Sequence, residues 1–319
     1  MLCGGILGIT TVLSIGCGGG KSSTGDAPAP DVRAVVTAAR SASNVPALAG
    51  AYISLNGIQS ESVGVRRSGT TDAVTPSDLY QVGSTAKSMT GTLAGALVEA
   101  GKIRWDTTIA EAFPDFADVI DPSYAGVTLE QLLQHRSGIV ALEGLEEILA
   151  LPEFGGTNRE QRRAFAQWAL SQPHTSPTKT FAYSNGGYAV AGAMLEVAAN
   201  DSWENLIEAR VLGRVGARPT FGSPRLNDLD QPWGHLEEGD TFAPYDQRTG
   251  YSIPPYLYPA GGINLSATDL ARYVQAHLQG LRGSSGNVFS PSYALRRRPS
   301  RLCGWLDRIH AERRTDRAA

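Results

Sequence analysis

The sequence predicts a mixed α/β (α+β) domain, in which a small antiparallel sheet lies beside a mainly helical lobe. Three observations lead to this class. Two short β-prone segments flank Asn56-Gly57, a residue pair typical of a tight hairpin turn. Helical patterns then dominate from residue 105 to about residue 216. The 319 residues, 42% of them hydrophobic, are enough to bury one sizeable core.

The first segment of the chain is typical of an exported bacterial protein. The apolar run at residues 6–15 is too short to span a bilayer as a helix. Small residues before Cys17 resemble a lipoprotein cleavage site, so we expect a signal peptide at residues 1–17 and a lipid on Cys17. An ordinary cleaved signal or a misassigned start codon remains an alternative, because no Lys or Arg precedes the apolar run. Residues 18–31, rich in Gly, Ser, Pro and Ala, are expected to form a flexible linker. This pattern predicts a cell-envelope protein, either periplasmic or held at the membrane by the lipid.

The first folded elements are a helix, a hairpin and a second helix. Asp31 is a candidate N-cap for a helix at residues 32–43. The hairpin strands are predicted at residues 52–55 and 63–66. A long helix is predicted to begin at Ser84 and to end near residue 100, because a glycine follows there.

The rest of the chain is predicted to be helical, with one loop-rich stretch at residues 222–258. Thr128 is a candidate N-cap for the first of these helices. The predicted helices are residues 129–135, 159–171, 188–199, 203–211 and 267–279.

Charge and cysteine content argue against several classes of partner. A net charge of −3 and a pI near 6.0 provide no electrostatic attraction for nucleic acid. Cys3 would leave with the signal and Cys17 would carry lipid, so Cys303 would have no partner and no disulfide is expected. The three cysteines also lack the spacing of metal ligands.

The segment Ser84-Thr85-Ala86-Lys87 is the strongest candidate for chemistry. A serine three residues before a lysine, at a helix start, has its side chain on the same helix face as the lysine. A base beside a hydroxyl is what a serine needs to become a nucleophile, and a helix N-terminus favours developing negative charge. The alternative is an ordinary capping serine followed by a solvated lysine.

Three further motifs follow in a recognisable order. They are His135-Arg136-Ser137-Gly138, Tyr183-Ser184-Asn185, and Pro259-Ala260-Gly261-Gly262-Ile263. With the first segment they resemble the serine β-lactamase-like family, which includes class C β-lactamases, D-alanyl-D-alanine carboxypeptidases and related esterases. The resemblance runs from about residue 49 to about residue 290. It implies a β-lactamase/transpeptidase-like domain at residues 32–295, with an all-α lobe at about residues 102–220.

The resemblance implies a role for each of four side chains. Ser84 would be the nucleophile, Lys87 the base or proton relay, and Tyr183 the group that passes the proton to the leaving group. Asn185 would bind the substrate's carbonyl side chain as well as Lys87. The reaction would be acyl transfer from an amide, ester or β-lactam in a small molecule or peptide, without a metal or an organic cofactor. A monomer is expected.

Four other residues are expected to support this site rather than react. His135 is expected to hydrogen-bond locally and hold the turn that contains Gly138. Gly261 and Gly262 are expected to permit close backbone packing or unusual dihedral angles near the cleft. A Ser-His-Asp triad is not expected, because no Asp stands at a recognisable spacing and Gly-x-Ser-x-Gly is absent from the sequence.

The sequence departs from the family after Gly261-Gly262. The family's third motif, a Lys, His or Arg followed by Thr or Ser and Gly, is not found there; Arg248-Thr249-Gly250 has the letters but precedes the glycine pair. Residues 296–319 form an Arg-rich tail unlike the family, which predicts a frameshift or truncation and a sheet left incomplete by missing C-terminal strands. Two alternatives to an active hydrolase therefore stay open: a catalytically impaired family member that binds ligand, and an envelope-anchored interaction protein that uses the basic tail.

Overall fold

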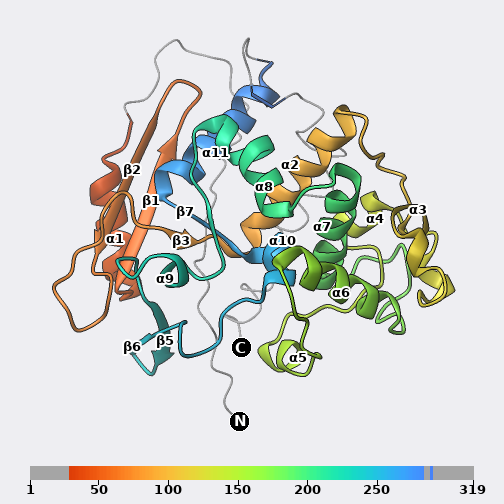
Figure 1. Ribbon diagram of the computed structural model, residues 1–319. Coiled ribbons are helices and arrows are strands. Elements are labelled where there is room, and N and C mark those ends of the chain that lie inside the picture. Colours follow the sequence, from red (N-terminus) through yellow and green to blue (C-terminus); the bar gives the residue numbers. More distant parts are fainter. Residues whose placement is uncertain (1–28, 284–287, 290–319) are drawn as a thin grey trace, which may run out of the picture.

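A computed structural model describes residues 29–283 and 288–289. It confirms the predicted mixed α/β class, with antiparallel strands beside a helical lobe (Figure 1). The predictions for the signal peptide, Cys17 and most of the linker lie outside the described residues, as do those for Cys303 and for the tail at 296–319. The predicted incompleteness of the sheet also concerns residues outside these ranges.

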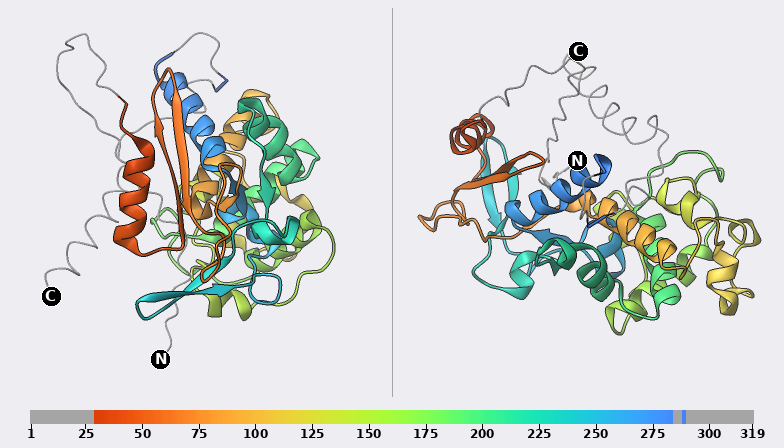
Figure 2. Two further views of the ribbon diagram at one scale, coloured as in Figure 1. Left: turned by 90° about the vertical axis from the view of Figure 1, so that its left-hand side faces the viewer. Right: turned by 90° about the horizontal axis from the view of Figure 1, so that it is seen from above.

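The N-terminal hairpin is packed between two helices. Strands β1 (Ala47–Ile53) and β2 (Ile58–Gly64) pair antiparallel, with Ile53 opposite Ile58. Helix α1 (Val32–Ser43) covers one face of the hairpin and α11 (Ala267–Leu281) covers the other (Figure 2). The hairpin at Asn56-Gly57 is confirmed, although both strands begin about five residues earlier than predicted.

Predicted helix starts agree with the observed caps. The Asp31 side chain accepts a hydrogen bond from Ala34 N at 3.0 Å, and Thr128 forms a capping box with Gln131. Both bonds satisfy N–H groups that a helix start leaves without an intrahelical partner.

The helical lobe is built around α2 (Ala86–Glu99) and α7 (Asn185–Ala199), which pack against each other. Met89 and Leu93 on α2 and Met194 on α7 have no exposed surface, so both helices form part of the central core. Between residues 102 and 219, every named element is helical. The other α-helices are α3 (Ile109–Ala112), α4 (Leu129–Leu133), α5 (Leu145–Leu149), α6 (Asn158–Leu170), α8 (Trp203–Ile207), α9 (Pro224–Asn227) and α10 (Tyr258–Gly261). Short 3₁₀ or π turns are η1 (Gly83–Thr85), η2 (Pro114–Phe116), η3 (Pro122–Tyr124), η4 (Glu208–Leu212), η5 (Gly213–Val215) and η6 (Pro255–Leu257).

The stretch predicted as loop-rich at residues 222–258 contains a second hairpin, which the sequence did not predict. Strands β5 (Gly234–Glu238) and β6 (Thr241–Tyr245) pair antiparallel across a turn at Gly239, whose φ is +61°. The prediction failed here because both strands are short and carry little of the β-branched alternation that indicates a strand.

A three-stranded sheet positions the start of α2. Its central strand β7 (Ile263–Leu265) pairs antiparallel with β3 (Tyr80–Gln81) on one side and β4 (Thr220–Phe221) on the other. Val82 N donates to Ile263 O at 2.9 Å, which extends the ladder towards Ser84. The Gly261-Gly262 segment is thereby held beside the turn that carries Ser84. No helix in the described ranges has both the length and the apolar character needed to cross a bilayer.

Candidate active site

Ser84 and Lys87 lie one helical turn apart, as their spacing predicts. Ser84 sits in the 3₁₀ turn η1, directly before α2, and Gly83 enters that turn at φ +53°. Lys87 Nζ lies 3.1 Å from Ser84 Oγ. Ser84 is exposed, whereas Lys87 is only 6% exposed, so the lysine lies beneath the serine and is shielded from solvent.

Lys87 Nζ has three oxygen neighbours. Besides Ser84 Oγ they are Asn185 Oδ1 at 2.7 Å and Ala260 O at 2.8 Å, which together match the three hydrogens of an ammonium group. Burial lowers the pKa of Lys87 to about 7, although the charge of Glu143 acts in the opposite direction. Near neutral pH the amine is therefore present in both protonation states. The neutral form can donate to Asn185 and Ala260 and still direct its lone pair at the Ser84 hydroxyl.

Tyr183 is the second polar side chain in contact with Ser84, after Lys87. Its hydroxyl lies 2.8 Å from Ser84 Oγ, and Lys87 Nζ lies 4.8 Å from the centre of its ring. Burial raises the pKa of Tyr183, while the hydrogen bond between Tyr183 and Ser84 lowers it. The raised pKa keeps the phenol protonated near neutral pH, so that it can act as a proton donor.

The start of α7 places Tyr183 and Asn185 on either side of a capping serine. Ser184 Oγ accepts from Gly187 N at 2.8 Å and donates to Val140 O at 2.8 Å. Ser184 is 2% exposed, so this cap fixes the chain direction at the point where both neighbouring side chains enter the site.

Asn185 joins Lys87 to the loop before α5. Its Oδ1 accepts from Lys87, its Nδ2 donates to Leu142 O at 2.7 Å, and its backbone N donates to Ala141 O at 2.8 Å. Because an amide nitrogen carries two hydrogens, the second one can serve a ligand. Leu142 is buried in the left-handed region at φ +53°, an uncommon conformation for a bulky residue that surrounding contacts must hold.

His135 makes a local hydrogen bond through its backbone, from its N to Leu132 O at 3.1 Å, whereas its side chain contacts the site over a long range. Its Nδ1 accepts from Ser184 N at 3.1 Å, across 49 residues of sequence. Its ring stacks on Tyr183 with centroids 4.4 Å apart. Burial and the charge of Lys87 lower the pKa of His135 to about 4, so the ring is neutral at pH 7 and can accept this bond.

The three glycines near the site differ in backbone conformation and in the space that their surroundings leave for a side chain. Gly138 has φ +77°, and a Cβ there would lie 2.5 Å from Ser176 O. A Cβ on Gly262 would lie 2.4 Å from Tyr258 Cδ1, so close packing is required. A Cβ on Gly261 would make only ordinary contacts, the nearest at 3.5 Å. Neither Gly261 nor Gly262 has a positive φ, so close packing, and not an unusual dihedral angle, is the alternative that holds, at Gly262.

Arg248-Thr249-Gly250 closes a local turn after β6. The Arg248 guanidinium pairs with the Asp246 carboxylate, and Thr249 Oγ1 donates to Asp246 O at 3.2 Å. These contacts account for the tripeptide without a role at Ser84.

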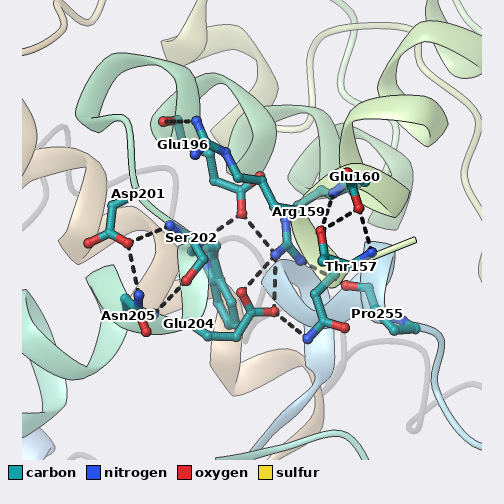
Figure 3. Close-up of polar contacts among 12 residues, drawn as sticks. Thr157, Arg159, Glu160, Glu196, Asp201, Ser202, Glu204, Asn205 and Pro255 are labelled. Carbon is teal, nitrogen blue, oxygen red and sulfur yellow. Dashed lines mark hydrogen bonds and ion pairs between the residues drawn. The ribbon is translucent and has the colours of Figure 1, made fainter. Parts of the chain in front are cut away.

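The sequence did not reveal that a backbone carbonyl of α10 contacts Lys87, nor how that carbonyl is held. Arg162 on α6 has no exposed surface and donates to Glu196 and Glu204, each at 2.9 Å, and to Pro255 O at 2.8 Å. Glu196, Glu204 and Pro255, which accept these bonds, are labelled in Figure 3. Pro255 begins η6, which runs directly into α10 and so to Ala260. The network therefore ties α6, α7 and α8 to the segment that supplies the carbonyl. A sequence pattern cannot indicate this, because an arginine on an amphipathic helix is usually solvated.

Within residues 29–283 and 288–289, no three His, Cys, Asp or Glu side chains are grouped so that they could hold a metal ion. The side chains gathered at Ser84 are thus a hydroxyl, an amine, a phenol and an amide, which is a set suited to proton transfer around a nucleophile.

Comparison with known proteins identifies relatives of this chain. The family model described as Beta-lactamase matches residues 32–301. Penicillin-binding protein 4 of Amycolatopsis lactamdurans is 30% identical over 277 residues, covering 85% of this chain and 69% of that protein. The beta-lactamase of Escherichia coli (strain K12) is 23% identical over 210 residues, which cover 65% of this chain and 50% of that protein.

Solved structures share the fold. The crystal structure of SurE superposes with a TM-score of 0.66 at 25% identity, covering 84% of this chain and 58% of that one. The D-alanine carboxypeptidase AmpC from Burkholderia cenocepacia superposes with a TM-score of 0.63 at 21% identity, covering 82% and 68% of the two chains. By sequence, architecture and family model, this chain belongs to the beta-lactamase family.

Proposed function

We propose that this chain is a serine hydrolase that acts through an acyl-enzyme intermediate on Ser84. The observation that carries the proposal is the position of Ser84 Oγ, within hydrogen-bond distance of both Lys87 Nζ (3.1 Å) and Tyr183 Oη (2.8 Å). A serine hydroxyl is a weak nucleophile, and a neighbouring base that is neutral part of the time is what activates it.

In the proposed reaction, neutral Lys87 takes the proton of Ser84 as Oγ bonds to the substrate's carbonyl carbon. The π electrons of the carbonyl move to its oxygen, and they return when the bond to the leaving nitrogen or oxygen breaks. Tyr183 gives the leaving group a proton and regains one from the Lys87 ammonium. Water then attacks the ester on Ser84 and releases the acid. Asn185 would orient the substrate through the second hydrogen of Nδ2.

The substrate class is an amide, an ester or a β-lactam, and the second candidate is a family member that binds such ligands with little turnover. This alternative rests on the sequence after Gly261-Gly262, where the family's third motif is not found. In the family that motif lies on a strand, and one N–H of the strand completes the oxyanion hole with the N–H of the nucleophile. Loss of one such donor lowers the rate by about 100- to 1,000-fold.

Labelling with a fluorescent penicillin, followed by intact-mass spectrometry, tests the proposal. We expect a covalent adduct on the wild type and none on Ser84→Ala. The control Ser88→Ala, which changes an exposed serine in the first turn of α2, should form the adduct as the wild type does. Equal labelling of the wild type and Ser84→Ala would overturn the proposal. Non-covalent binding without an adduct would support the binding protein instead. Hydrolysis of a chromogenic ester by the same three proteins measures the second half of the reaction.

We also propose that the protein is exported and held at the cell envelope by a lipid on Cys17. The support is the apolar run at residues 6–15 followed by small residues and Cys17 in the sequence. Cys17→Ala should move the protein from the membrane fraction to the soluble fraction. An unchanged membrane fraction would exclude the lipid anchor.

A further inference from the structure

Thr90 is a buried polar residue that shares one face of α2 with Lys87, which lies three residues earlier. Thr90 has no exposed surface, and its Oγ1 donates to Pro259 O at 2.8 Å. The Nζ of Lys87 donates to the next carbonyl, Ala260 O, also at 2.8 Å. Two side chains of α2 therefore hold two successive carbonyls of α10, which packs against the start of α2 (Figure 1).

The short helix α10 depends on such contacts for its position. It has a single turn, so its last carbonyls lack donors within the helix. The carbonyls of Pro259 and Ala260 take their donors from the two side chains of α2. Gly261 O accepts from Gln81 Nε2 at 3.3 Å. The place of this turn in the site is thus set by side-chain donors as well as by packing.

Thr92, two residues further along α2 than Thr90, is also buried but bonds away from α10. Its Oγ1 donates to Ser88 O at 2.9 Å and lies 3.0 Å from Tyr273 Oη and 3.2 Å from His277 Nε2. These partners belong to α2 and α11, and Thr92 is 3% exposed. Thr92 therefore provides a control that matches Thr90 in residue type, burial and helix.

Several charged or titratable groups face Lys87 from the elements around it. The rings of Tyr183 and Tyr188, which flank the start of α7, lie 4.8 Å and 5.5 Å from Nζ. Glu143, on the loop before α5, raises the pKa of the lysine, and the charge of the lysine lowers the pKa of His135. All of these groups lie outside α10, so a change that moves only α10 leaves them in place.

The contact with Ala260 favours the charged form of Lys87. A charged donor makes a stronger hydrogen bond to a carbonyl than a neutral amine does. Loss of this acceptor would therefore let the ammonium give up its proton at a lower pH. Without the Thr90 hydroxyl, Pro259 O would be buried without its donor, and a shift of α10 that finds another donor would also move Ala260 O.

We propose that Thr90 is a positioning residue, which keeps Ala260 O in contact with Lys87 Nζ by holding Pro259 O. The inference deepens the proposed function and rests on it, since Lys87 serves there as the base for Ser84. Thr90 acts through α10 and does not touch the reacting atoms.

Nuclear magnetic resonance of carbon-13-labelled lysine tests the inference without a substrate. The chain contains four lysines, so the signals are few, and Lys87→Met identifies the one to follow. We expect the pKa of Lys87, about 7 in the wild type, to fall by about 0.5–1 pH unit in Thr90→Val, which is about a three- to tenfold change in the proton dissociation constant. Thr90→Ser keeps the hydroxyl and should titrate as the wild type does. Thr92→Val should also leave the pKa of Lys87 unchanged.

An unchanged pKa of Lys87 in Thr90→Val would overturn the inference, and so would an equal fall in Thr92→Val. The first result would mean that packing against α7 holds the turn alone, since a Cβ on Gly192 would lie 2.5 Å from Pro259 Cγ. Should Thr90→Val fail to fold, Thr90→Ala, which also lacks the hydroxyl, should show the same fall.

The proposed function fails separately, when the wild type forms no covalent adduct with fluorescent penicillin, and the lysine titration still decides whether Thr90 acts on Lys87. When the adduct forms, the pH dependence of acylation by Thr90→Val should move to lower pH by the amount seen in the titration. A profile that stays in place would overturn the role of Thr90 in the reaction.

Discussion

The imidazole ring of His135 stacks on the phenol ring of Tyr183, with 4.4 Å between the ring centroids and 29° between the planes. The same imidazole accepts a hydrogen bond from Ser184 N, the next residue after Tyr183. Two contacts thus fix one tyrosine, whose hydroxyl lies 2.8 Å from Ser84 Oγ. His135 is held at φ +57°, a conformation that Asn and His tolerate better than most residues.

Replacing His135 tests this support. His135→Ala should lower the free energy of unfolding by about 2–3 kcal/mol, because the buried Ser184 N–H loses its acceptor and the ring contact is lost. Acylation by fluorescent penicillin should slow about tenfold as Tyr183 loses its fixed orientation. Urea denaturation and labelling rates measure the two effects. His135→Asn, which tolerates the positive φ, should lose less stability than His135→Ala; an equal loss would contradict the conformational part of the argument.

Acylation should depend on pH through Lys87. Below a pKa of about 7 the amine is protonated and cannot take the Ser84 proton, so the rate should rise about tenfold per pH unit up to about pH 7 and then level off. Stopped-flow measurement of the labelling rate at about ten pH values between about pH 5 and pH 9 would give the pH dependence of acylation. A rate independent of pH across this range would show that Lys87 is not the base.

The stability cost of burying Lys87 should also depend on pH. Its pKa is lowered from the ordinary value of 10.5 to about 7 in the folded chain, so between these values the unfolded chain binds more protons at this site. Wild-type stability should therefore rise with pH across that window relative to Lys87→Met, on the order of 1 kcal/mol per pH unit. Urea denaturation of the two proteins at about pH 7.5 and about pH 9.5, both between the two pKa values of Lys87, measures this effect. The contributions of the other titrating groups are the same in both proteins and cancel in the difference. A constant difference between them would refute the lowered pKa.

The Arg162 network should matter far more than a neighbouring surface ion pair. Arg162→Met leaves Glu196 and Glu204 without their cation, which should cost about 3–5 kcal/mol. Arg163, the next residue on α6, forms an exposed ion pair with Asp115. Arg163→Met removes this pair and should lower the free energy of unfolding by less than about 1 kcal/mol. Urea midpoints measure both. Similar shifts for the two variants would mean that the buried network does not hold α10 in place.

Gly261, the last residue of α10, and Gly262, which follows it, provide another matched pair. Gly262→Ala places a Cβ 2.4 Å from Tyr258 Cδ1 and should destabilise the protein by about 1–3 kcal/mol. Gly261→Ala meets its nearest atom at 3.5 Å, so its midpoint of thermal unfolding should stay within a few degrees of the wild type. Equal midpoints for the two variants would be inconsistent with the packing around Tyr258.

Local features were predictable because they depend on short stretches of chain. The spacing of Ser84 and Lys87 places them together through helix geometry alone, and their 3.1 Å contact agrees with that expectation. Asp31 and Thr128 cap helices as predicted, and Asn56-Gly57 closes a hairpin. Within the stretch predicted as loop-rich, residues 222–258, the hairpin of β5 and β6 was missed because its short strands lack a strong pattern.

By itself the sequence determined the family, the order of the motifs and the helical pair that opens the site. The resemblance already implied that Tyr183 and Asn185 lie beside that pair, and only the tertiary structure decided that the carbonyl of Ala260 joins them. Asn185 and Ala260 reach Lys87 from 98 and 173 residues away, and a backbone carbonyl carries no residue-specific signal. The pKa of Lys87 was equally beyond the sequence, because it follows from burial, and burial is a property of the packed chain.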